Sequence, residues 1–398
     1  MKHFLISILI LSMAIMSFGV KLNLLYAWKY IDFLWESPQQ RQKAIDFGEY
    51  NPGSIVLEDV DEAPDGRIFI TAVKDKDVPA TVMTVSNEKE ERSPLLRPYP
   101  NWSWHTNKSC KGITAVYRIC IKCNHIFVVD SGRIGNDNVC PPQLLIFDLS
   151  NDKLVKRINI PLNVANSKNG TNGLLTTPIV VAPYCENIKD TAIVFITDTA
   201  GYGLVVYNSN TSKFCRIETE FMKPNRKTFT IENISFNLTD GIHHLAIVHK
   251  DLYYSALAAD KLYKIEISKL IDCSLSDSEA NEVTQLAGTL SGQTGPIIFE
   301  ECAILFSNFP ETSIMCADAT KKIGPDNMEV IVQNSEELQC IIGMKMIDRS
   351  HSKSMKILTN RCQHSIIGAM NINETNFRIL SMDIAEIRKA TNCFASCN

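Results

Sequence analysis

Six short apolar runs recur along this chain of 398 residues, and each stops at a small or polar residue. The runs are Ile68–Thr71, Phe127–Val129, Val194–Thr197, Leu252–Ser255, Ile304–Ser307 and Lys356–Thr359. They are rich in β-branched and aromatic residues and too short for helices, so each predicts a buried β-strand. They are spaced roughly 50 to 70 residues apart, close to the range that marks an array of repeated supersecondary units.

A second predicted strand follows each run after a short polar turn. These companions are Val82–Val85, Leu144–Asp148, Leu204–Tyr207, Leu262–Ile267, Ser313–Cys316 and Phe377–Leu380. Two strands cannot bury their apolar faces alone, whereas six such modules in a radial array can. The sequence therefore predicts an all-β fold, a six-bladed β-propeller in which weaker strands complete each blade. The alternative is a large β-sandwich or two stacked β-domains, which the regular spacing disfavours.

The first 19 residues have the pattern of a cleaved signal peptide. A basic start at Lys2 precedes an apolar run that ends near the small residues Ser17 and Gly19. This run is shorter than the roughly 20 residues that span a bilayer, which disfavours a membrane anchor. Residues 20–398 are then expected to form a single propeller, secreted from the cell.

Both ends of the mature chain have predicted roles. The aromatic segment Trp28–Trp35 and the helical segment Gln39–Asp46 precede the first blade, and an N-terminal strand is expected to close the ring by completing the last blade. The segment Met382–Ala390 has helical spacing, and Cys393 and Cys397 behind it are positioned to fasten the tail to the ring.

Charge and cysteine content narrow the class of protein further. A formal net charge of −4 gives no electrostatic basis for binding nucleic acid or an anionic membrane. In a secreted chain, thirteen cysteines indicate disulfides, with at least one thiol left over because the number is odd. Seven Asn-x-Ser/Thr sequons predict a glycoprotein, at Asn101, Asn107, Asn169, Asn210, Asn233, Asn237 and Asn373.

The repeat also predicts the position of a ligand site. The six runs end at Ala72, Asp130, Asp198, Ala256, Asn308 and Asn360. Equivalent positions in a radial array are expected to face the same end of the central channel, where Asp130, Asp198, Asn308 and Asn360 would form a polar ring for a cation or a small amine. The alternative is that these side chains end strands by bonding to nearby backbone groups.

Evidence for catalysis is weaker. The sequence contains no nucleophile elbow, zinc-protease motif or phosphate loop, and we predict no catalytic residue, metal or cofactor. His243 and His244 are expected to point to opposite faces of a strand, which disfavours a shared metal and favours a loop or surface role.

Several motifs resemble the major royal jelly protein and Yellow family of insects, and the royal jelly branch in particular. They are Trp28–Phe33, Arg41–Ile45, Gly48–Tyr50, Leu95–Trp102, Cys110–Thr114, Val128–Gly132, Thr239–Ile242, Leu252–Ser255 and Asn376–Leu380. The resemblance runs from about Trp28 to Cys393 and implies a six-bladed propeller. It also implies the disulfides Cys110 with Cys140, Cys123 with Cys185, and Cys316 with Cys393.

Seven other cysteines lie outside the implied pattern, so their bonding is open: Cys120, Cys215, Cys273, Cys302, Cys340, Cys362 and Cys397. Cys120 and Cys302 stand in apolar surroundings and are expected to be buried free thiols.

The resemblance also bears on ligands. Salivary members of the family bind biogenic amines in the channel, and one of their polar contacts corresponds to Asn360. Cys362 replaces an aromatic contact and Met344 a hydroxyl contact, which would weaken the binding of an amine.

Three functions follow as hypotheses. The first is a secreted, non-enzymatic glycoprotein with a nutritive, glandular-secretion or venom-like role, with room for a small ligand in its channel. The second is a binding protein for an amine or a lipid. The third is an enzyme of the melanin pathway, through dopachrome conversion, or a metal-dependent hydrolase. The odd cysteine and oligomerising relatives leave a homo-oligomer open.

Overall fold

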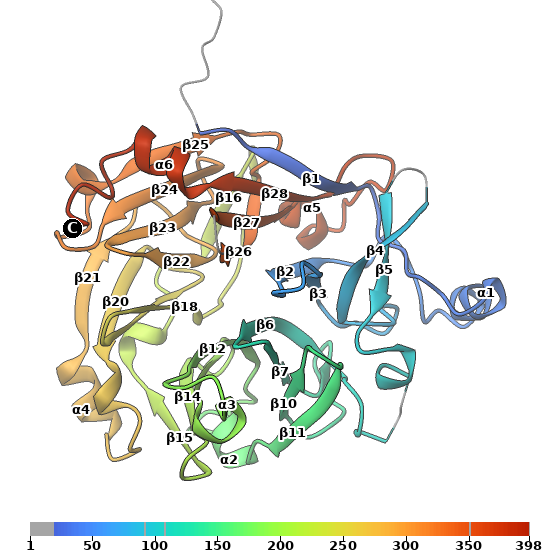
Figure 1. Cartoon of the computed structure of the whole chain (residues 1–398), viewed down its shortest axis with the longest axis horizontal. Coiled ribbons are helices and arrows are strands. Elements are labelled where there is room, and N and C mark those ends of the chain that lie inside the picture. Colours follow the sequence, from blue (N-terminus) through green and yellow to red (C-terminus); the bar gives the residue numbers. More distant parts are fainter. Residues whose placement is uncertain (1–19, 91–92, 107–108, 350–351, 398) are drawn as a thin grey trace, which may run out of the picture.

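The computed structural model describes residues 20–90, 93–106, 109–349 and 352–397, and it shows a ring of six four-stranded antiparallel sheets (Figure 1). Each sheet is one propeller blade, so the predicted fold class is confirmed. The predicted signal peptide, residues 1–19, and the sequon at Asn107 lie outside the described residues.

The strands follow the same order in every blade, from the axis outward. Blade 1 contains β2 (Leu57–Glu62), β3 (Ile68–Ala72), β4 (Val82–Glu90) and β5 (Ser93–Pro98). Blade 2 contains β6 (Val116–Lys122), β7 (His125–Asp130), β10 (Gln143–Asp148) and β11 (Lys153–Asn159), and blade 3 contains β12 (Leu175–Val181), β13 (Ile193–Asp198), β14 (Gly203–Asn208) and β15 (Lys213–Glu218). Blade 4 contains β18 (Ile242–Val248), β19 (Asp251–Ala256), β20 (Lys261–Glu266) and β21 (Gln285–Thr289), and blade 5 contains β22 (Ile297–Glu300), β23 (Ala303–Asn308), β24 (Ser313–Asp318) and β25 (Glu329–Gln333).

Blade 6 joins the two ends of the chain. It consists of β26 (Cys340–Arg349), β27 (Ser352–Asn360), β28 (Phe377–Asp383) and, as its outermost strand, β1 (Asn23–Trp28). Because β1 pairs antiparallel with β28, the predicted closure of the ring by an N-terminal strand is confirmed. The six first strands, β2, β6, β12, β18, β22 and β26, contact one another around the axis.

The apolar runs of the sequence are the second strands of the blades, and their companions are the third strands. Both faces of these strands are buried, because each face packs on a neighbouring blade. Phe127 of β7 lies in the hydrophobic cluster shared with blade 3, whereas Ile126 and Val128 lie in the cluster shared with blade 1. Six such clusters fill the spaces between adjacent blades. Burial on both faces explains why these strands read as continuous apolar runs.

The remaining elements lie outside the blades. The helices are α1 (Pro38–Asp46), α2 (Leu162–Ala165), α3 (Ile188–Thr191), α4 (Asp277–Val283), α5 (Cys362–Ile366) and α6 (Ile384–Ala390), with short 3₁₀ turns at Trp102–Trp104, Glu220–Met222, Ile267–Lys269 and Pro325–Asn327. Two hairpins are formed by β8 (Arg133–Ile134) with β9 (Asp137–Asn138), and by β16 (Thr228–Ile231) with β17 (Ile234–Asn237). Within the described ranges, no helix is long and apolar enough to cross a membrane.

Six disulfides use twelve of the thirteen cysteines. The three pairs that the family resemblance implied are present: Cys110–Cys140, Cys123–Cys185 and Cys316–Cys393. The other three are Cys215–Cys273, Cys302–Cys397 and Cys340–Cys362. Cys120 is free, as expected. The expectation of a free thiol at Cys302 is wrong, because the C-terminal tail brings Cys397 to it.

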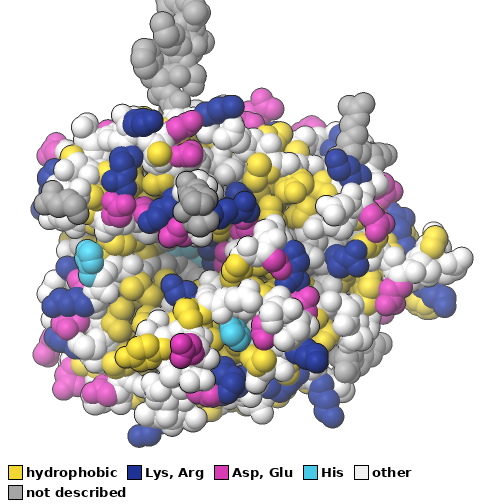
Figure 2. Space-filling view, viewed as in Figure 1, with side chains coloured by type: hydrophobic (Ala, Val, Ile, Leu, Met, Phe, Trp, Pro, Cys, Tyr) yellow, Lys and Arg dark blue, Asp and Glu magenta, His cyan; other side chains and the backbone are white. Residues whose placement is uncertain are grey.

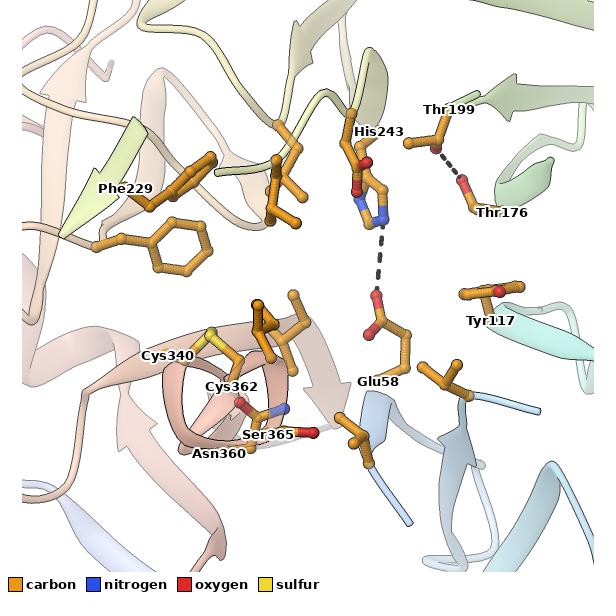
Figure 3. Close-up of a pocket in the computed structure, with 18 of the residues that line it drawn as sticks. Glu58, Tyr117, Thr176, Thr199, Phe229, His243, Cys340, Asn360, Cys362 and Ser365 are labelled. Atoms are coloured by element: carbon orange, nitrogen blue, oxygen red, sulfur yellow. Dashed lines mark hydrogen bonds and ion pairs between the residues drawn. A yellow bond between two sulfur atoms is a disulfide. The ribbon is translucent and has the colours of Figure 1, made fainter. Parts of the chain in front are cut away.

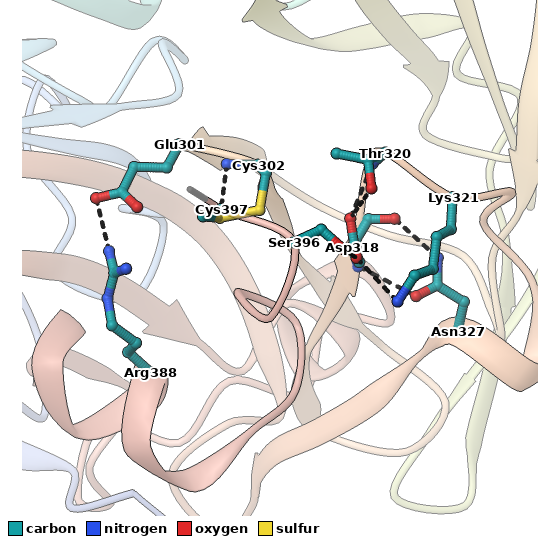
Figure 4. The surroundings of a disulfide bond; sticks show 9 residues. All are labelled: Glu301, Cys302, Asp318, Thr320, Lys321, Asn327, Arg388, Ser396 and Cys397. Atoms are coloured by element: carbon teal, nitrogen blue, oxygen red, sulfur yellow. Dashed lines mark hydrogen bonds and ion pairs between the residues drawn. A yellow bond between two sulfur atoms is a disulfide. The ribbon is translucent and has the colours of Figure 1, made fainter.

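The C-terminal tail is fastened to blade 5 by two of these bonds. Figure 4 shows Cys302 bonded to Cys397 beside the ion pair between Arg388 of α6 and Glu301, which are 2.6 Å apart. In the same region, the Ser396 hydroxyl donates a 2.5 Å hydrogen bond to the Asp318 carboxylate. Since α6 itself packs on β27 and β28, the tail joins blade 6 to blade 5.

Charges and sequons are spread over the surface. Basic and acidic side chains are interspersed on the face shown in Figure 2. The six sequon asparagines within the described residues are all exposed: Asn101, Asn169, Asn210, Asn233, Asn237 and Asn373. Their side chains are therefore accessible for glycosylation.

Candidate functional site

A cavity of about 280 Å³ lies on the propeller axis, at the end of the ring where the first strands begin. Five of the six first strands each contribute a lining residue from near their starts: Glu58, Tyr117, Thr176, His243 and Ile342. The site is therefore built from the innermost layer of the ring (Figure 3).

The wall of the cavity away from the ring is apolar and comes largely from the hairpin β16–β17. Alternate residues of a strand point to opposite faces, so Phe229, Ile231 and Phe236 face inward while Thr230 and Asn237 are exposed. The rings of Phe229 and Phe236 stack with their centroids 5.4 Å apart. We call this hairpin, residues 228–237, the cap.

Residues from blades 4 to 6 and their connecting loops contact the cap and hold it in place. The Gln293 amide donates hydrogen bonds to the main-chain oxygens of Arg226 and Thr228, at 3.2 and 2.6 Å. On the opposite side, β17 packs on α5, which begins at the Cys340–Cys362 disulfide. The disulfide and Phe309 complete the apolar wall.

The end of the cavity nearest the first strands is polar. The hydroxyl groups of Thr176 and Thr199 form a 2.7 Å hydrogen bond with each other. By contrast, the Oδ1 atom of Asn360 is buried without a hydrogen-bond partner among the described residues. Asp240 also lines this end, and its burial raises the pKa of its carboxyl group.

Glu58 is the innermost acid of the cavity. Its carboxyl group lies 3.5 Å from the guanidinium of Arg118 and 3.6 Å from Nε2 of His243. Burial raises the pKa of Glu58 to about 8, even though the charge of Arg118 acts in the opposite direction. At neutral pH this carboxyl group is therefore mostly protonated.

The two adjacent histidines are buried together, which corrects their predicted placement. The pairing of β18 with β19 shifts register between Ile242 and His244, and this irregularity brings both rings to one side. Nδ1 of His243 lies 3.0 Å from Nε2 of His244. Burial lowers both pKa values well below the usual value, so both rings are neutral. The predicted loop or surface role is therefore wrong.

Of the four residues in the predicted polar ring, only Asn360 lines the cavity. The carboxylate of Asp130 accepts hydrogen bonds from the backbone of Thr114, Ala115 and Gly132, at 2.8 to 3.0 Å. Asp198 accepts hydrogen bonds from Leu174 and Gly201 and pairs with Arg216 at 2.8 Å. Asn308 donates a 2.7 Å hydrogen bond to Ser291.

The ring is not assembled because its members end second strands, which lie one strand away from the axis. Asp130, Asp198 and Asn308 bond to nearby groups instead, as the turn-residue alternative describes. Apart from Asn360, the residues of the blade strands that line the axial cavity come from the first strands, whose sequences are less apolar.

Sequence reasoning missed a charged network on the first strands. Asp59 of β2 is fully buried between Arg118 of β6, at 3.4 Å, and Lys345 of β26, at 3.2 Å. Glu62, at the other end of β2, pairs with Lys356 at 3.2 Å and with Arg349. The acidic stretch Glu58–Glu62 is the sequence signal that could have revealed it, since four acids in five residues rarely form a buried strand without partners.

Two further expectations concerned the wall of the cavity. Cys362 does line it, but as half of a disulfide. Met344 packs instead in the hydrophobic cluster between blades 5 and 6. The aromatic surface that Cys362 lacks is supplied by Phe229, Phe236 and Phe309 from other elements.

The cavity is a largely apolar pocket whose lining includes the acids Glu58 and Asp240. No group of three histidine, cysteine or acidic side chains with metal-binding geometry occurs in the described part of the chain. Fold and cavity together define a six-bladed propeller with a pocket on its axis.

Comparison with known proteins identifies the family. The chain belongs to the major royal jelly protein family, whose model matches residues 114–393. It is 34% identical to major royal jelly protein 9 of Apis mellifera over 385 residues, covering 92% of this chain and 89% of that protein. It is also 34% identical to major royal jelly protein 8 of Apis mellifera, covering 94% and 93%. Among solved structures, it is similar to a luciferin-regenerating enzyme with a TM-score of 0.49 and 10% identity, covering 91% of this chain and 95% of that one.

Proposed function

We propose that this protein is a secreted glycoprotein that acts without catalysing a reaction, in a nutritive, glandular or venom-like secretion, and that it holds a small molecule in its axial cavity. Membership of the royal jelly family supports the first part. Six disulfides are typical of an oxidising compartment, and the exposed sequons offer sites for glycans.

The observation that carries the ligand proposal is the two-sided lining of the cavity. A stacked aromatic wall faces a polar end that presents Glu58, Asp240 and the unpaired oxygen of Asn360. Such a pocket, apolar with a few converging polar groups, is the usual form of a small-molecule site. All three polar groups can accept hydrogen bonds, so the ligand is expected to carry a donor at one end.

Of the two ligand classes that the sequence suggests, the cavity favours an amine over a lipid. Its volume of about 280 Å³ lies just below the range of about 300–1,000 Å³ that holds drug-sized ligands, which favours a small ligand. The ring of an aromatic amine can pack on the stacked phenylalanines, and its amino group can contact the acids. A long acyl chain is too long for the cavity and carries no group that would contact the acids.

Native mass spectrometry of the deglycosylated, secreted protein tests this proposal with a panel of aromatic amines, fatty acids and sterols. An amine adduct is expected in the wild-type protein. Phe229→Ala removes much of the stacking wall and is expected to weaken binding about tenfold or more, because burial of such a ring is worth about 1.5–3 kcal/mol. Phe47→Ala, on a ring that is 77% exposed beyond α1, is the matched control.

Three results would count against the proposal. The first is the absence of any adduct across the panel, and the second is an adduct that Phe229→Ala leaves unchanged. The third is turnover of a panel compound, which would contradict the non-enzymatic part. Secretion and glycosylation are tested separately, by N-terminal sequencing of the exported protein, expected to begin after Gly19, and by the mass lost on enzymatic removal of N-glycans.

A further inference from the structure

Glu58 stands apart from the other acids near the axis, because its one cationic partner, Arg118, is shared with Asp59. Asp59, its neighbour on β2, lies between Arg118 and Lys345 and accepts a backbone hydrogen bond from Ile119. Glu58 has only the longer contacts to Arg118 and His243, at 3.5 and 3.6 Å. Its carboxyl group instead faces the cavity.

The groups around Glu58 compensate its charge only in part. On β6, Arg118 is shared with Asp59, and Tyr117 is a neutral phenol whose pKa burial raises to about 12. On β18, His243 is neutral. Asp240, before β18, is a second acid, and Lys345 of β26 pairs with Asp59 and Asp61 rather than with Glu58. Glu58 thus shares its only cationic partner, Arg118, with Asp59, and Asp240 adds a further acid to the cavity.

We propose that Glu58 determines the charge specificity of the cavity: it holds a proton when the cavity is empty and exchanges that proton for the positive charge of the ligand. This inference rests on the proposed function, since it concerns the same cavity. It identifies Glu58 as the residue that recognises the charge of the ligand. It also predicts that a proton leaves Glu58 when the ligand binds.

The exchange follows from the cost of burying charge. An ionised Glu58 in the empty cavity would be a desolvated anion without a full partner, so the proton stays on the carboxyl group. An ammonium group in contact with Glu58 supplies the missing partner, and the ionised form then becomes the stable one. The raised pKa of Glu58 in the empty protein, about 8, agrees with this geometry.

The exchange predicts a specific pH dependence. Below the pKa of Glu58 in the empty protein, each unit of falling pH makes the proton ten times harder to displace, so affinity for a cation falls about tenfold per unit. Above that pKa the affinity levels off. A neutral ligand of the same shape displaces no proton, so its affinity does not follow this curve.

Calorimetric titration with tryptamine and its uncharged analogue 3-ethylindole tests the inference, in two buffers of different ionisation enthalpy between pH 6 and pH 8.5. Wild-type protein is expected to release close to one proton per tryptamine at pH 7 and to bind it about fiftyfold more tightly at pH 8 than at pH 6, because half of Glu58 is already ionised at pH 8. Glu58→Gln, which mimics the protonated side chain in shape, is expected to release none and to vary less than twofold across this range.

Glu300→Gln is the matched control, because Glu300 is a buried acid on a first strand outside the cavity. It is expected to leave the proton release unchanged. Tryptamine binding without proton release, or release that persists in Glu58→Gln, overturns this inference and leaves the proposed function standing. Failure of both probes to bind overturns the inference together with the proposed amine ligand.

Discussion

The side-chain amide of Asn360 donates a 2.9 Å hydrogen bond to the main-chain oxygen of Leu57, a residue 303 positions earlier in the chain. The bond joins the end of β27 in blade 6 to the start of β2 in blade 1. Asn360 also lines the axial cavity, where its side-chain oxygen is buried without a hydrogen-bond partner among the described residues. One residue therefore belongs to both the closure of the ring and the lining of the site.

Replacing Asn360 with alanine is expected to lower the free energy of unfolding by about 1–3 kcal/mol, because the buried oxygen of Leu57 loses its donor. Urea unfolding monitored by tryptophan fluorescence measures this change. Asn172→Ala, on an exposed asparagine, is the control and is expected to change stability by less than about 0.5 kcal/mol. Equal stability of the two variants would show that the bond between the blades contributes nothing.

Replacing Arg118 with methionine is expected to destabilise the protein by about 3–5 kcal/mol, since it leaves Asp59 and Glu58 as neighbouring buried acids without their shared cation. A lower yield of folded protein and a lower unfolding midpoint report this effect. The triple variant Arg118→Met, Glu58→Gln, Asp59→Asn removes the charges as well and is expected to recover part of the loss. A triple variant no more stable than the single one would mean that Arg118 acts through packing.

The contacts of the C-terminal tail predict that the stability of the protein depends on pH in the acid range. Burial opposes ionisation of Asp318, but hydrogen bonds from Ser396 and Thr320 and the ammonium of Lys321 outweigh it and lower the pKa to about 2, from 3.8. A lowered pKa in the folded state stabilises the fold above about pH 4, and this contribution is lost as the pH falls toward 2.

Ser396→Ala is therefore expected to cost about 1.5–3 kcal/mol at pH 6 and progressively less as the pH falls to 2, because a protonated Asp318 gains little from the hydroxyl group. Urea unfolding at pH 6, 4 and 2.5 measures the difference. Ser268→Ala removes a comparable hydroxyl bond to the less buried Glu266 and serves as the control. A cost for Ser396→Ala that does not vary with pH would contradict the assignment.

Thiol labelling tests the disulfide pattern. Burial raises the pKa of Cys120 to about 11, so its reactive thiolate is scarce at neutral pH. Iodoacetamide is expected to add no label to the native protein at pH 7.5, one label after unfolding without reductant, and thirteen after reduction. Two or more labels in the unfolded, unreduced protein would contradict the six disulfides, and a covalent dimer would show that Cys120 is accessible.

The fold could be predicted because the middle strands of each blade are buried on both faces. Such strands need apolar residues at every position, so Phe127–Val129 and Val194–Thr197 stand out from the rest of the sequence. The first strands carry no comparable signal. Asp59 can be buried there because Arg118 pairs with it, a partner that comes about 60 residues later and that no local pattern reveals.

The site was predicted less well than the fold for a related reason. Asp130 and Asp198 sit at equivalent positions of the repeat, but that equivalence places them at the ends of second strands, away from the axis. His243 and His244 share one side because of an irregular register, which alternation along a strand does not anticipate. Asn360 was found because it is the run-ending residue that reaches the cavity.

The pairing of β1 with β28 has a consequence for how the protein is made. During translation β1 is synthesised first, and β28 is synthesised only after the first five blades. The edge of β1 therefore stays unpaired during nearly all of synthesis. The bonds of Cys393 and Cys397 to blade 5 also need the last residues of the chain. A nascent chain that stops early thus keeps an open sheet edge and unpaired thiols, and both features distinguish it chemically from a finished molecule.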